Sequence, residues 1–143
     1  MSEEVEEAAE DLFIYMRGKV AARRVRNVDT PYPVIEVDTV DSGTIGGRRV
    51  SDIVTYVQKE LPNGMYDGRA EVVITVPGGA PTNETVAVWK GIGVGRSDGQ
   101  GGIKWVGGIT VHSKSERLDG IAAYGHFTVS SDGDVVQRFY RVN

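Results

Sequence analysis

The chain of 143 residues carries 16 lysines and arginines against 20 aspartates and glutamates, a formal net charge of −4. This length and charge suit one soluble domain and argue against a two-domain enzyme. Cysteine is absent, which excludes disulfides, thiol nucleophiles and zinc–cysteine sites. The start Met1-Ser2-Glu3-Glu4 is acidic, unlike a secretory signal, and no apolar run approaches the roughly 18 residues of a membrane span. We therefore expect a cytoplasmic protein without membrane contact.

The first residues differ from the rest of the chain. Val5, Ala8, Ala9 and Leu12 recur at helical spacing, and Ser2 can cap a helix start. We predict a short helical or frayed segment over residues 1–11, followed by one domain over residues 12–143.

That domain is typical of an all-β fold. Clusters of Gly, Pro, Asn, Asp and Ser recur at nearly even spacing and separate eight segments rich in Val, Ile, Thr, Tyr and Phe. Connections this short cannot hold crossover helices, so neighbouring strands should pair antiparallel. We predict an eight-stranded antiparallel up-and-down β-barrel, with a two-sheet sandwich as the alternative. The clearest predicted strands are 50–61, 65–76, 85–95, 103–113, 121–130 and 135–142.

Alternation along the strands predicts which side chains face inward. The row that carries Trp105 and the row that carries Phe127 are mostly apolar, so they should face the lumen. His112 and His126 then lie on the outer face. Trp89 is expected inside above Gly91, Gly93 and Gly95, which either leave room in the lumen or permit strong coiling of the strand.

Charges on the first two strands are explained by pairing across a turn at Pro31. Antiparallel pairing of the two strands that flank this turn brings Arg26 near Glu36 and Arg24 near Asp38. Because the chain is acidic overall and these carboxylates accompany the arginines, we expect no nucleic-acid partner.

Known motifs of catalysis and cofactor binding are missing from the sequence. The run Gly91-Ile92-Gly93-Val94-Gly95 lacks the spacing of a phosphate loop and lies within a predicted strand. A metal site would need both histidines together with loop acids such as Glu116 or Asp119, and no Ser-His-Asp arrangement is visible. We expect no metal, no cofactor and no covalent catalysis.

Aromatic residues on most strands are the best candidates for a ligand site. Phenols and an arginine among apolar walls would bind an apolar molecule with one polar end and could polarise a carbonyl or enolate. The predicted catalytic residues are Arg138, Tyr56 and Tyr140. The predicted ligand-binding residues are Tyr15, Arg17, Tyr66, Trp89, Trp105 and Phe127. A core filled by its own side chains is the competing interpretation.

A resemblance to a group of known proteins lies in three segments, the strand 89–96, the strand 102–108 and the turn 118–122. Together with Tyr56 and Tyr66, their glycine-aromatic pattern resembles a group of small, uncharacterised single-domain bacterial proteins, over residues 12–142. The fold implied is similar to calycin and allene-oxide-cyclase-like barrels, some of which catalyse cyclisation or [4+2] cycloaddition by holding a flexible substrate folded. No catalytic residue of those barrels carries over by motif.

Two functions are therefore weighed. The first is a small-molecule-binding barrel acting as a cofactor-independent cyclase or isomerase on an apolar or polyketide-like substrate, by confinement and polarisation. The second is a non-catalytic ligand carrier or a homodimeric interaction protein with a filled barrel. An open lumen would favour the first.

Overall fold

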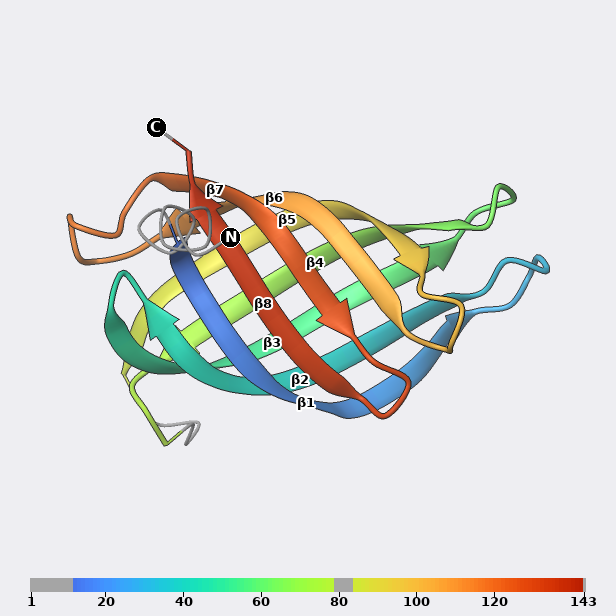
Figure 1. Ribbon diagram of the computed structural model, residues 1–143, viewed down its shortest axis with the longest axis horizontal. Coiled ribbons are helices and arrows are strands. Elements are labelled where there is room, and N and C mark those ends of the chain that lie inside the picture. The colour runs from blue at the N-terminus through green and yellow to red at the C-terminus, as the bar shows by residue number, and fades with distance from the viewer. Residues whose placement is uncertain (1–11, 79–83, 143) are drawn as a thin grey trace, which may run out of the picture.

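The computed structural model describes residues 12–78 and 84–142, and these form a closed eight-stranded barrel (Figure 1). The predicted helical segment 1–11 lies outside the described residues. The strands run up and down in chain order, each antiparallel to its neighbours, and β8 closes on β1. The barrel prediction is confirmed and the sandwich is wrong. The strands are β1 (Leu12–Asn27), β2 (Val34–Ile45), β3 (Arg48–Glu60), β4 (Met65–Thr75), β5 (Thr85–Ser97), β6 (Ile103–His112), β7 (Ile121–Val129) and β8 (Asp134–Arg141).

Short hairpins set the register of the barrel. The β2–β3 turn uses Gly46 and Gly47, both with positive φ (54° and 82°), which is the conformation that a two-residue hairpin loop requires. Ile45 therefore pairs with Arg48, and every later pair along this hairpin is fixed by that turn. Among the described residues, no helix is long and apolar enough to cross a membrane.

The inward rows form the core. Trp89 and Trp105 are 2% and 6% exposed, and Phe127 is also buried, so the predicted inward rows are confirmed. His112 and His126 are exposed on the outer face, as predicted. One end of the barrel is closed by Phe13, Ile45 and Leu118, all of them buried.

The other end is more open. It lies at the β1–β2, β3–β4, β5–β6 and β7–β8 hairpins (Figure 1). Inward-row residues near this end, Ile35, Tyr66 and Ile103, are only partly buried although they pack on the core.

Ion pairs on the outer face join β1 to β2. Arg24 contacts Asp38 at 2.6 Å through Nη2 and Glu36 at 2.7 Å through Nε, and Arg26 contacts Glu36 at 2.6 Å. The Arg24 guanidinium lowers the pKa of both carboxyl groups. The predicted cross-strand charge pairing is confirmed, and these arginines are engaged with neighbouring acids.

Candidate functional site: an aromatic cavity and a buried carboxyl pair

A band of glycines crosses four neighbouring strands on one side of the lumen. Gly68 of β4 pairs with Gly93 of β5, Gly93 with Gly107 of β6, and Gly107 with Gly125 of β7. A Cβ atom on Gly107 would lie 2.1 Å from the Ile92 carbonyl oxygen, and one on Gly125 would lie 1.9 Å from the Arg138 carbonyl oxygen. These two positions need glycine because the adjacent backbones approach closely.

Gly68 and Gly95 make room for the side chain of Trp105. Cβ atoms there would lie 2.4 Å and 2.9 Å from the indole ring of Trp105, so the ring lies directly over both glycines. The glycine-rich wall is therefore partly filled by an aromatic side chain, and only part of the lumen stays empty.

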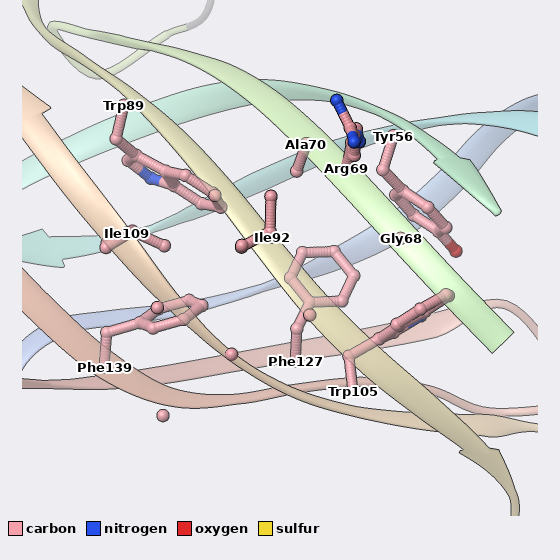
Figure 2. A pocket seen from close by; sticks show the side chains of 15 residues that line it. Tyr56, Gly68, Arg69, Ala70, Trp89, Ile92, Trp105, Ile109, Phe127 and Phe139 are labelled. Atoms are coloured by element: carbon pink, nitrogen blue, oxygen red, sulfur yellow. The ribbon is translucent and has the colours of Figure 1, made fainter. Parts of the chain in front are cut away.

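The remaining space is an apolar cavity of about 50 Å³ beside this wall. Figure 2 shows Trp89 and Phe139 together at one end of it and Tyr56, Phe127 and Trp105 at the other. Ring centroids are 5.4 Å apart for Trp89–Phe139, 5.5 Å for Tyr56–Phe127 and 5.8 Å for Tyr56–Trp105. The cavity is small, so a ligand of more than a few atoms needs side chains to move.

Few polar groups lie at the cavity, and some of them lack a hydrogen-bond partner. The indole nitrogens of Trp89 and Trp105 are buried and have no hydrogen-bond partner among the described residues. Burial raises the pKa of Tyr56 to about 12, and the charge of Arg23 and the Trp105 side chain partly offset this rise. The Tyr56 phenol is therefore neutral at physiological pH and can donate a hydrogen bond but cannot act as a base.

The other half of the barrel buries a polar cluster, formed by Thr39, Asp41, Asp52 and Gln137. None of the four is more than 2% exposed. Gln137 Nε2 donates to Asp41 Oδ2 at 3.0 Å and to Asp52 Oδ2 at 2.9 Å, and the Thr39 hydroxyl donates to Asp41 Oδ2 at 2.8 Å. Two carboxyl groups are thus held by one amide inside the barrel.

Backbone geometry makes room for this pair. Asp41 and Asp52 are direct cross-strand partners in the β2–β3 hairpin. Gly18 of β1 lies beside Asp41, where a Cβ atom would be 2.1 Å from Asp41 Oδ1. Burial raises the pKa of Asp52 well above its usual value of 3.8, and the hydrogen bond and charge of Asp41 add to this rise. Like charges this close cannot both ionise readily, so the Asp41 carboxyl opposes the ionisation of Asp52.

Of the residues predicted from the sequence, the structure brings five together. Tyr56, Trp89, Trp105 and Phe127 line the cavity, and Tyr66 contacts Trp105 edge-on, with ring centroids 6.4 Å apart. Whether any of them binds a ligand stays a prediction.

The other four predicted residues lie outside the lumen. Arg138 is exposed and lies over the ring of Tyr15, 5.2 Å from its centroid. Arg17 is exposed, and Tyr140 stacks beside Tyr124 on the outer face at 6.2 Å. Arg17 and Arg138 were expected to orient a ligand inside the barrel, but both lie outside the lumen. On β8 the row that faces inward carries Val135, Gln137 and Phe139 instead of Arg138.

Family models, curated proteins and solved structures gave no match to this chain. The functional argument therefore depends on the barrel, its cavity and the buried polar cluster.

Proposed function

We propose that this barrel binds a small molecule in its aromatic cavity. The observation that carries the proposal is the buried indole N–H of Trp89, a residue that lines the apolar cavity, which has no acceptor in the described part of the chain. Buried donors left unpaired cost free energy, and a ligand with a polar group removes that cost. An apolar wall with a few polar groups is the usual composition of a ligand pocket.

The chemistry proposed for this site is cofactor-independent cyclisation or isomerisation. The neutral Tyr56 phenol and the indole donors could polarise a carbonyl, and confinement between aromatic rings would hold a substrate folded. The eight-stranded topology is compatible with the resemblance to calycin and allene-oxide-cyclase-like barrels, some of which cyclise their substrates in this way. A cytoplasmic location remains part of the proposal.

A cavity-filling variant tests the binding site. Ala70 lines the cavity, so Ala70→Leu should fill it and reduce the affinity for a fluorescent apolar dye by at least about tenfold, as about 1.4 kcal/mol of lost contact would give. Ala122→Leu is the matched control, because Ala122 is exposed on the outer face of β7 and should leave dye binding unchanged. Equal dye binding by wild type and Ala70→Leu would show that the dye does not use this cavity.

Self-association is the second candidate function, and a row of exposed apolar side chains on the outer face favours it. Val40, Ile53, Val73 and Val88 are direct cross-strand partners over β2 to β5 and are 51%, 41%, 41% and 38% exposed. Glu71 and Lys90, which also pair across β4 and β5, border the groove beside this row. A second copy related by a two-fold axis would cover the row and bring opposite charges together.

The oligomeric state tests this second candidate. Sedimentation velocity at micromolar concentration should show a dimer for wild type and a monomer for Ile53→Glu, because a charge in the centre of the apolar row opposes its burial. Val25→Glu is the control, since Val25 is 66% exposed away from the row, and this variant should remain a dimer. A monomeric wild type would contradict the candidate.

A further inference from the structure

The unpartnered polar atoms of the cluster inside the barrel are all oxygens. Both hydrogens of the Gln137 amide are used on the two aspartates, and the Thr39 hydroxyl is used on Asp41. Asp41 Oδ1, Asp52 Oδ1 and Gln137 Oε1 are buried without a partner in the described part of the chain. Carboxylate and amide oxygens accept hydrogen bonds, so this cluster needs a donor.

The cluster also carries uncompensated negative charge. Within residues 12–78 and 84–142, no lysine, arginine or histidine forms a salt bridge with Asp41 or Asp52. Negative charge on either carboxyl is therefore buried without a counter-charge from the described residues. A buried charge without a partner is costly, and a ligand that carries one positive charge would remove this cost.

The cluster does not itself line the aromatic cavity, but it lies next to residues that do. Gln137 pairs with Phe127 across β7 and β8 and lies two residues from Phe139, and both phenylalanines line the cavity. The charge of Asp41 also acts on the Tyr56 phenol, where it adds to the burial that raises the pKa of Tyr56. Aromatic faces attract organic cations, so the rings and the carboxyl pair favour the same kind of ligand.

We propose that Asp41, Asp52 and Gln137 form the polar end of the ligand site and that it takes a primary ammonium group in preference to a carboxylate. This inference rests on the proposed ligand-binding function and narrows it. An ammonium group supplies three N–H donors and one positive charge, which suits buried oxygens without a partner and carboxyl groups without a counter-charge. The arginines that would have favoured an anionic ligand, Arg17 and Arg138, lie outside the lumen.

Three probes of the same chain length and different charge test the proposal. Propylammonium, 1-propanol and propionate would be titrated into the protein at constant ionic strength, and the side-chain amide signals of Gln137 and the indole signals of both tryptophans would be followed by NMR. We expect saturable shifts of the Gln137 signals with propylammonium, an affinity at least about tenfold higher than for propanol, and no binding of propionate.

Isosteric variants separate charge from shape. Asp52→Asn keeps one negative charge at Asp41, so the preference for propylammonium over propanol should persist. The double variant Asp41→Asn/Asp52→Asn removes the charge, so the preference should be lost while propanol still binds. Circular dichroism would verify that both variants fold.

Two results would overturn the proposal in different ways. If propanol binds and propylammonium shows no preference, the cavity binds ligands but the carboxyl pair does not select them, and the proposed function survives. If no probe shifts the tryptophan or Gln137 signals, both this inference and small-molecule binding in the cavity are contradicted.

Discussion

Replacing Trp105 with alanine is expected to lower the free energy of unfolding by about 3–5 kcal/mol, the usual cost of truncating a buried tryptophan. Trp105 is 6% exposed and lies over Gly68 and Gly95, which have no side chains to fill the space that it would leave. It also contacts the rings of Tyr56 and Tyr66. Urea denaturation followed by circular dichroism measures the loss.

The same change should enlarge the cavity. Trp105 lines it, so the variant should bind benzene or a similar small apolar molecule more tightly than wild type does. Tyr124→Ala serves as the control, because Tyr124 is an exposed aromatic residue on the outer face and its loss should have little effect on stability. A Trp105→Ala variant as stable as wild type would mean that the barrel is not packed around this ring.

Asp52→Asn is expected to stabilise the protein at neutral pH by about 1–2 kcal/mol. The pKa of Asp52 is raised by burial and by Asp41, so the folded state binds this proton more tightly than the unfolded state does. The stability that the protonated group contributes is complete below its unfolded pKa of 3.8 and falls as the pH rises toward the folded pKa. Asparagine keeps the shape and cannot ionise, so the variant avoids this loss.

The pH dependence gives the sharper test of the carboxyl pair. The advantage of Asp52→Asn over wild type should shrink as the pH falls and vanish below the unfolded pKa of 3.8, where Asp52 becomes protonated in both states. Asp38→Asn is the control with the opposite sign, because Arg24 lowers the pKa of Asp38 and ionisation there stabilises the fold. Urea denaturation at several pH values measures both. An Asp52→Asn variant destabilised at neutral pH would mean that the ionised carboxylate is needed.

The fold follows from local signals in the sequence. Turn residues at even spacing mark the strand ends, and the observed strand β4 (Met65–Thr75) and strand β7 (Ile121–Val129) agree with prediction to within one residue. The inward placement of Trp105 and Phe127 follows from alternation, because the opposite faces of their strands carry lysine and histidine. These strands were predictable because one face is clearly apolar.

The alternation signal failed on β8. Both of its faces carry apolar and polar residues, so the sequence did not decide between the row with Arg138 and the row with Gln137. The pairing of β8 with β7 and β1 decides it, and such pairing between distant parts of the chain is not visible in a single strand. The glycine band likewise appears only when four strands are aligned.

The carboxyl pair was missed although a signal was present. Asp41 and Asp52 lie at equal distances from the Gly46-Gly47 turn, so a two-residue hairpin makes them direct partners. Like charges directly opposite each other destabilise a sheet, and such a pair indicates a special environment. Their inward direction was hidden because apolar Val40 and Ile53, the adjacent pair, face outward.

The central claim is that the barrel interior holds a small molecule, and native mass spectrometry of protein purified from its own host tests it most directly. The mass measured under native conditions, compared with that of a denatured sample, should exceed the chain mass by that of one small molecule, and Ala70→Leu should lose this excess. Equal native and denatured masses in repeated preparations, together with no binding of an apolar dye, would contradict the claim and favour self-association through the outer apolar row.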